Sequence, residues 1–332
     1  MKPIKTVFIV LTALLGLMFC FLLSLAVGAR SVTLQQVFSV FKNMEDDSFI
    51  ALVVKERIPR TVFSMIAGAS LGISGALMQS VTRNPIADPG ILGVNTGASL
   101  AVVCGIAFFQ IQTAGQYIWF ALAGAGLTAI LVYGIGSMGQ GGATPLKLAL
   151  AGAAVSASLS SVISTIMLPR STVMNDFRFW QVGSVSGATW EGISTILPFL
   201  LVGWVLTFLL APSLNTLALG EEAAIGLGVN TGRVRMAGAL AGVLLCGAVT
   251  ALAGPIGFVG LMIPHAIRLL FGANAIRVIL MSSLGGAMLL TLADVIGRAV
   301  GRPGELEAGI VTAFLGAPVL IVIARRAKVK SI

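Results

Sequence analysis

The sequence is divided into long apolar blocks that are nearly free of charge, each close to 20 residues. A helix of roughly 20 apolar residues crosses about 30 Å of hydrocarbon and satisfies its backbone groups internally. Only 10% of the 332 residues are charged and 57% are hydrophobic, whereas an ordinary soluble domain carries about 25% charged residues. We therefore predict an all-α, polytopic membrane protein.

Ten of these blocks are predicted to span the membrane. The first follows a basic start, MKPIK, as a secretory signal would, but its apolar run exceeds the usual ~7 to 15 residues, which favours a retained helix. The eighth is short and rich in glycine and proline, so the count is uncertain by one. The predicted spans are 6–27, 57–79, 91–110, 117–137, 145–168, 193–210, 234–252, 256–270, 276–296 and 308–324.

The distribution of charge predicts that both termini lie in the cytoplasm. In that orientation 12 of the 21 Lys and Arg residues are cytoplasmic, and 9 of the 12 acidic residues are outside. An excess of Lys and Arg on the cytoplasmic side is the usual topology signal. We attribute the net charge of +9 to contact with anionic lipid rather than to nucleic acid. The expected location is the inner membrane of a bacterium.

Three connections, at 30–56, 169–190 and 211–233, are too polar for lipid and too long for simple turns, and we expect them to face partners. The glycines of GIGSMG, at 134–139, match a dinucleotide-binding pattern, which has meaning only between a strand and a helix. Here they end an apolar span, so a flexible connection is expected. The whole chain is predicted to form one permease domain, 1–332.

The cytoplasmic segment LGEEAAIGLGVNTGRVR carries the strongest motif. Glu222, Ala223, Ala224 and Gly228 reproduce the first part of the EAA-x3-G element of ABC-importer membrane subunits, although the later I-x-L-P part is absent. A short helix with acids near its start and glycines at its end can fit a groove on another protein. The same acids also suit the positive end of a helix dipole, so a capping role is an alternative.

With this segment the chain closely resembles the permease family of type II ABC importers for ferric siderophores, haem and cobalamin. The other motifs are RIPRTVFSMIAGASLGISGALMQSVTRNPIADPGILG, GPIGFVGLMIPHAIRLLFG, ADVIGR and VTAFLGAPV, and the resemblance is strongest over 57–326. It implies a ten-helix subunit that pairs with a second copy or a related permease. It also implies an extracytoplasmic substrate-binding protein and an ATPase dimer that holds ATP and Mg. No cofactor or metal is expected on this chain.

The resemblance also implies that part of 211–233 is the coupling helix that docks on the ATPase. The residues assigned to this role are Glu221, Glu222, Ala223, Ala224, Gly226, Leu227 and Gly228.

Four arginines are candidates for docking the binding protein. Arg57 and Arg60 share a helix face at the predicted outer start of the second span, where a cation opposes the helix dipole. This favours an acidic partner, although snorkelling to lipid phosphate is an alternative. Arg298 lies in the ADVIGR motif and can pair with Asp294 at i, i+4. Arg302 is a further candidate.

The fifth span carries a small, weakly polar stripe, formed by Gly152, Ser156, Ser160 and Ser164 at intervals of four. Such a stripe can allow close helix packing. It can also offer a smooth lining to a bulky chelate, and in the resembled family this helix borders the central pathway. The two interpretations remain open.

Metal binding and catalysis are not expected. His265 is the only histidine, and the three cysteines are scattered through apolar spans, so no ligand set can be completed. We predict the membrane subunit of an ABC importer for an iron chelate, most simply a ferric siderophore, with haem or cobalamin as alternatives. A secondary transporter driven by an ion gradient is the alternative class, but it should show buried acids along its spans.

The hexapeptide LGVNTG occurs twice, at 92–97 and 227–232. The residues around the two copies share no identities, which argues against a duplicated unit. Both copies lie where a span is predicted to begin. Asn and Gly suit turns and helix starts, so we expect shared local structure, and a functional role only for the second copy.

Overall fold

Each of the ten predicted spans coincides with one helix in the computed structural model, which describes residues 3–28, 31–43, 48–139 and 144–326. Seven are long and apolar enough to cross a membrane, and α4, α11 and the apolar part of α13 are shorter. The all-α polytopic fold is confirmed, and the described residues contain no strand. The helices are α1 (Pro3–Ala26), α3 (Phe49–Thr82), α4 (Val94–Phe109), α5 (Ala114–Ser137), α6 (Pro145–Met167), α8 (Trp190–Leu217), α10 (Thr231–Ala253), α11 (Val259–Phe271), α12 (Ala275–Val300) and α13 (Ala308–Arg326).

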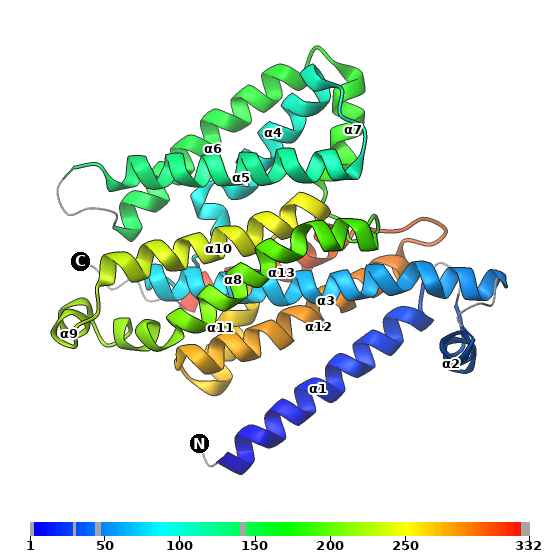
Figure 1. Ribbon diagram of the computed structural model, residues 1–332, viewed down its shortest axis with the longest axis horizontal. Coiled ribbons are helices and arrows are strands. Elements are labelled where there is room, and N and C mark those ends of the chain that lie inside the picture. Colours follow the sequence, from blue (N-terminus) through cyan, green and yellow to red (C-terminus); the bar gives the residue numbers. More distant parts are fainter. Residues whose placement is uncertain (1–2, 29–30, 44–47, 140–143, 327–332) are drawn as a thin grey trace.

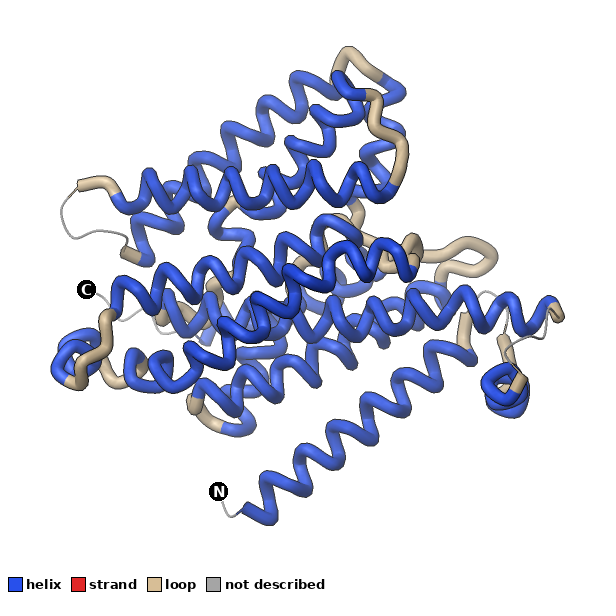
Figure 2. The backbone as a smooth tube through the Cα atoms, viewed as in Figure 1, coloured by secondary structure: helices blue, strands red, loops and turns tan. Residues whose placement is uncertain are grey.

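The long polar connections contain short helices of their own. These are α2 (Leu34–Lys42), α7 (Ser171–Gln181) and α9 (Glu221–Gly226), and a 3-10 helix, η1 (Pro89–Leu92), precedes α4. Loops and turns gather at two opposite ends of the bundle (Figure 2). One end carries α2, α7 and the start of α3, and the other carries α9 and the end of α8 (Figure 1). We name them the α2 end and the α9 end.

Seven helices begin with the same local chemistry. A Ser, Thr or Asn just before the helix accepts a hydrogen bond from the backbone N–H three residues later, which satisfies a group that has no partner within the helix. The capping residues are Thr33, Ser48, Thr113, Thr144, Thr189, Asn230 and Asn274.

The long helix α3 lies at the centre of the bundle, between α12, α10 and α11 (Figure 1). Its glycines bring it into backbone contact with two neighbours. A Cβ added at Gly68 or Gly75 would collide with the carbonyl oxygen of Gly286 on α12 or of Gly260 on α11, respectively. Gly72 faces the carbonyl of Ser282 in the same way. Small residues at such seams let helices approach closely in a membrane.

The two LGVNTG copies have the same backbone conformation at their first glycine, but their asparagines make different contacts. The glycine at the second position is left-handed in both, with φ of 71° at Gly93 and 81° at Gly228. In the second copy Asn230 caps α10, as expected. In the first copy α4 has already begun at Val94, and Asn95 accepts a hydrogen bond from Thr250 of α10 at 3.0 Å. The first copy therefore also lies at a helix start, as expected, but Gly93 and not Asn95 is the residue before the helix, and the Asn95 side chain packs against α10.

Candidate functional sites

The segment predicted to couple to an ATPase forms a small helical projection at the α9 end (Figure 1). Gly220 precedes α9 with φ of 130°, a conformation that favours glycine. Ala224 is buried against the rest of the protein, and the backbone N–H of Val229 returns to its carbonyl at 2.9 Å. Ala224 is therefore the buried contact of this helix with the bundle.

The remaining residues of the projection are exposed. Ile225 is 59% exposed and Leu227 is 65% exposed, and Gly226 between them is also exposed. The exposed members of the predicted set are Glu221, Glu222, Ala223, Gly226, Leu227 and Gly228. A compact, partly apolar surface of this kind is suited to contact with another protein. Coupling itself stays a prediction.

Glu221 fixes the start of α9 to α10. Its carboxylate accepts hydrogen bonds from Arg235 at 3.0 Å and from Thr231 at 3.3 Å. The hydrogen bond from Arg235 lowers the pKa of Glu221 below its ordinary value. No side chain caps the backbone at the start of α9, so the capping interpretation stays a prediction, and Glu221 is instead bound to α10 while Glu222 is exposed outside that network.

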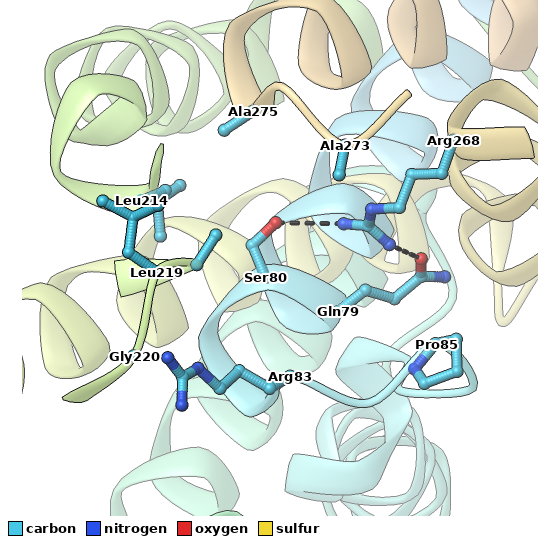
Figure 3. Close-up of a pocket in the computed structure, with 11 residues that line it drawn as sticks. Gln79, Ser80, Arg83, Pro85, Leu214, Leu219, Gly220, Arg268, Ala273 and Ala275 are labelled. Carbon is cyan, nitrogen blue, oxygen red and sulfur yellow. Dashed lines mark hydrogen bonds between the residues drawn. The ribbon is translucent and has the colours of Figure 1, made fainter. Parts of the chain in front are cut away.

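A cavity of about 470 Å³ lies near this projection, between the ends of α3 and α8 and the adjoining α11. Figure 3 shows Arg268 of α11 reaching across it to α3, where it donates to Gln79 and, at 3.0 Å, to Ser80. Arg83 extends toward Gly220 and donates to the carbonyl of Leu217 at the end of α8. Sequence reasoning missed this cavity. The signal in the sequence was Gln79 and Arg268, two strongly polar residues near the ends of apolar stretches.

Arg57 is buried at the α2 end, with 9% exposure. Its guanidinium donates to the carbonyl of Leu25 in α1 at 2.8 Å. The prediction that Arg57 and Arg60 occupy the first turn of their helix is wrong. Because Ser48 caps α3, the helix begins at Phe49 and both arginines lie beyond the first turn, where the helix dipole has little effect.

Arg60 joins two distant segments through ion pairs. It binds Asp294 of α12 at 2.6 Å and Glu305 at 2.7 Å. Asp294 also pairs with Arg298 at 2.9 Å, as the i, i+4 spacing predicted. Asp294 and Arg298 are each 1% exposed. A buried carboxylate is thus shared by two buried or nearly buried guanidiniums.

Arg298 and Arg302 hold the end of α1. Arg298 donates to the carbonyls of Ser24 at 3.0 Å and Val27 at 2.8 Å. Arg302, which is exposed, donates to the carbonyl of Gly28 at 2.6 Å. Helix carbonyls at a C-terminus lack intrahelical partners, and cations there are favourable. These guanidiniums therefore act as caps for α1.

The structure brings three of the four predicted docking arginines to one cavity. Its volume is about 250 Å³, and its lining comprises Val53, Glu56, Arg57, Arg60, Ser186, Arg298 and Glu305. Arg302 does not line it. Whether this cavity receives a binding protein remains a prediction.

The small-residue stripe of α6 has two halves with different surroundings. A Cβ at Gly152 would collide with the carbonyl of Ile91 in η1, and Ser156 lies against Gly93. Ser160 and Ser164 instead line a cavity of about 330 Å³, together with Asn95, Thr96, Ser99, Ile163, Gln181 and Pro255. Close packing therefore explains the first half. The pathway role remains a prediction for the second half.

The described residues contain no group of three or more His, Cys, Asp or Glu side chains that could hold a metal ion. The three cysteines are free thiols, and His265 is partly buried in α11. The glycines of GIGSMG lie at the end of α5 and just after it, not beside a strand.

These features define a polytopic membrane permease: a bundle of apolar helices with a buried ionic network at one end and an exposed helical projection at the other. The chain belongs to the FecCD transport family, which it matches over residues 16–326. It is a transport permease of the bacterial cell membrane and not an enzyme.

Individual relatives agree with this assignment. The chain is 42% identical over 304 residues to the ferric enterobactin transport system permease protein of Escherichia coli (strain K12), which covers 92% of this chain and 91% of that protein. It is 40% identical over 306 residues to the Fe(3+)-citrate import system permease protein YfmD of Bacillus subtilis (strain 168), which covers 92% of this chain and 91% of the relative.

Two solved structures have a related fold. One is an inward-facing metal-chelate type ABC transporter, with a TM-score of 0.80, 28% identity and coverage of 95% of this chain and 98% of the other. The second is PsaBC from Streptococcus pneumoniae, with a TM-score of 0.56, 16% identity and coverage of 90% and 97%. At that identity the second likeness concerns the fold alone.

Proposed function

We propose that this chain is the membrane-spanning subunit of an ATP-driven ABC importer that carries an iron chelate, in the first place a ferric siderophore, into the cytoplasm. The observation that carries the proposal is the full-length similarity to permeases named for ferric enterobactin and ferric citrate. Haem and cobalamin are the alternative cargoes. The chain acts with a second permease copy or paralogue.

An ATPase dimer is the proposed partner at the α9 end, where it holds ATP and Mg while this chain binds no cofactor. The exposed surface around Ile225 and Leu227 supports this role. Because α9 is fixed to α10 through Glu221 and Arg235, a movement of the projection would be passed on to a long helix of the bundle.

An extracytoplasmic substrate-binding protein is the proposed partner at the α2 end, with both termini of the chain in the cytoplasm. Arg57, Arg60 and Arg298 are mostly engaged within the protein. Acidic side chains of the partner would therefore meet the rim of their cavity and the exposed Arg302. A docking test with Arg60→Glu must measure the stability of the variant as well as its affinity for the binding protein. The new carboxylate would lie beside those of Asp294 and Glu305.

The proposed transport path follows the half of the α6 stripe that lines a cavity, Ser160 and Ser164. Neutral hydroxyl and amide groups surround that cavity. They offer hydrogen bonds to a passing chelate without a strong metal ligand, so release is not hindered.

An ion-driven secondary transporter is the second candidate. Asp294, a buried acidic residue of α12, is paired with two arginines, which makes it a poor proton carrier. Asp88, between α3 and α4, favours this candidate more. It is held by one backbone N–H, from Gly90 at 2.8 Å, and burial raises the pKa of its carboxyl.

The test is transport by the reconstituted complex. The chain is placed in liposomes with its ATPase and with binding proteins loaded with ferric siderophore, haem or cobalamin. Uptake of the radiolabelled metal is measured, which is iron for the siderophore and haem and cobalt for cobalamin. We expect uptake of the siderophore that requires ATP and persists in the presence of a protonophore. Uptake without the ATPase, abolished by the protonophore and by Asp88→Asn, would instead establish the secondary transporter.

A further inference from the structure

The short helix α2 has an apolar side that the rest of the protein covers only in part. At 100° per residue, Leu34, Phe38 and Phe41 fall on one side of the helix, and Val37 and Val40 fall beside them. Val37 and Val40 are buried in a small cluster with the end of α1 and the start of α3. This contact fixes the rotation of α2.

With that rotation fixed, the other apolar side chains point outward. Leu34 is 49% exposed, Phe38 is 52% exposed and Phe41 is 40% exposed. Their spacing of four and three residues makes them neighbours on the helix surface. An apolar trio without a charge is an unfavourable surface in water.

The orientation of α2 differs from that of the spans. In Figure 1 α2 is seen almost end-on, whereas α1 and α3 are seen from the side, so α2 lies across them near the end of α1. It stands on the flank occupied by α1, away from α4, α5 and α6. On that flank α1 exposes Leu15 and Phe19, by 71% and 63%, as expected of a helix against lipid.

The polar residues of α2 complete the pattern. Ser39 lies nearly opposite Phe41 around the helix, Gln35 lies between Ser39 and Lys42, and both are exposed. Lys42 is next to Phe38 around the helix, at the border between the two sides, and is also exposed. A cation at this border can reach lipid phosphate while apolar neighbours enter the acyl region.

We propose that α2 is an interfacial helix that inserts Leu34, Phe38 and Phe41 into the membrane leaflet at the α2 end. Lipid is the occupant favoured by three observations: α2 lies across the spans, it is at the level where α1 ends, and it stands beside α1, whose Leu15 and Phe19 are exposed. The helix would set the depth of the first connection in the membrane. It would also hold the start of α3, the helix that carries Arg57 and Arg60 further along. Insertion of α2 requires only that the chain lies in a membrane, and it is independent of which chelate is carried and of the ATPase.

Spin-label accessibility in the full chain tests the proposal. Single cysteines are introduced at Phe38, Phe41, Gln35 and Ser39 in a background with Cys20, Cys104 and Cys246 changed to alanine. The labelled proteins are reconstituted in vesicles of phosphatidylethanolamine and phosphatidylglycerol. We expect labels at 38 and 41 to collide more with oxygen than with a water-soluble nickel complex. Labels at 35 and 39 should show the reverse.

Equal nickel accessibility at 38 and 35 would overturn the proposal, because it would mean that α2 stands in water. A second result would also overturn the proposal. If adding a binding protein lowered the oxygen accessibility of the label at 38, the surface would belong to that partner. If the cysteine-free background does not fold, Phe38→Trp and Gln35→Trp in the natural chain replace it. Brominated lipids should then quench the added fluorescence of Phe38→Trp several-fold more than that of Gln35→Trp, and equal quenching would reject the proposal.

Discussion

The two ends of the bundle both use arginine, but they use it differently. At the α2 end, Arg298 is 1% exposed and shares the buried Asp294 with Arg60. At the α9 end, Arg235 pairs with Glu221, whose side chain is 45% exposed. One end is an internal network that joins α1, α3 and α12, and the other is a surface with an ion pair at its edge.

The difference matters because burial decides what an ion pair contributes. Removing one partner of a buried pair leaves an uncompensated charge and costs about 3–5 kcal/mol. An exposed pair contributes about 0–1 kcal/mol. We therefore expect substitutions at the α2 end to act on folding, and substitutions at the α9 end to act on partner contact.

The largest effect is expected for Asp294→Ala. Arg298 and Arg60 would lose their shared carboxylate inside the protein, with a cost on the order of 3–5 kcal/mol. Thermal unfolding of the purified protein in detergent, followed by the reactivity of the buried thiols, should show a marked fall in Tm.

The matched control is Glu305→Gln. Glu305 also pairs with Arg60, but its side chain is 35% exposed, so the expected loss is under about 1 kcal/mol. Equal falls in Tm for the two variants would contradict the contrast between buried and exposed pairs.

At the α9 end, Ile225→Asp should weaken binding of the ATPase about tenfold, which corresponds to roughly 1.4 kcal/mol. The Tm should change little, because the side chain is 59% exposed. Co-purification and titration with the ATPase measure the effect. The control outside the projection is Met138→Asp, because Met138, just after α5, is 70% exposed. An equal loss of ATPase affinity in this variant would show that α9 is not the specific contact.

A smaller effect is expected for Arg302→Ala, which removes the exposed cap on Gly28. A cation at a helix C-terminus contributes about 0.3–1 kcal/mol, so the Tm should fall slightly. Arg302→Lys, which keeps a cation at this position, should leave the Tm nearly unchanged. A fall for Arg302→Ala as large as for Asp294→Ala would show that the network extends to the surface.

The smallest effect concerns the pH dependence of Glu221. Its pKa is lowered in the folded protein by Arg235, so its contribution to stability is present above the ordinary value of 4.5 and is lost as the pH falls through the folded pKa. Since the pair is exposed, the change should stay under about 1 kcal/mol and shrink at high salt. Arg235→Ala should remove the contribution of Glu221 alone, so the free energies of unfolding of wild type and variant should converge as the pH falls below 4.5.

The spans were predictable because each is a continuous apolar block, and the helix caps were predictable where Ser, Thr or Asn stands before one. The early start of α3 was not. Lys55, Glu56 and Pro59 interrupt FIALVVKERIPR and suggest a loop, whereas tertiary contacts keep this stretch helical. The sequence-based boundary at Arg57 placed two site residues in the wrong turn.

The ionic network shows the same limit. The pair of Asp294 with Arg298 follows from their spacing, because one helix turn fixes it. The pair of Asp294 with Arg60 joins residues far apart in the chain, and no local pattern specifies it. Likewise, the periodicity of the α6 stripe predicted a face, but only the fold could show that η1 covers Gly152 while a cavity adjoins Ser164.

The glycines of α3 have a consequence for motion. Gly68, Gly72 and Gly75 hold α3 in direct backbone contact with α11 and α12, so α3 cannot turn about its axis without driving a side chain into a neighbouring carbonyl. Close-packed elements of this kind move together. We expect α3, α11 and α12 to behave as one rigid body during transport, and the boundary that opens and closes to run between this body and the helices outside it.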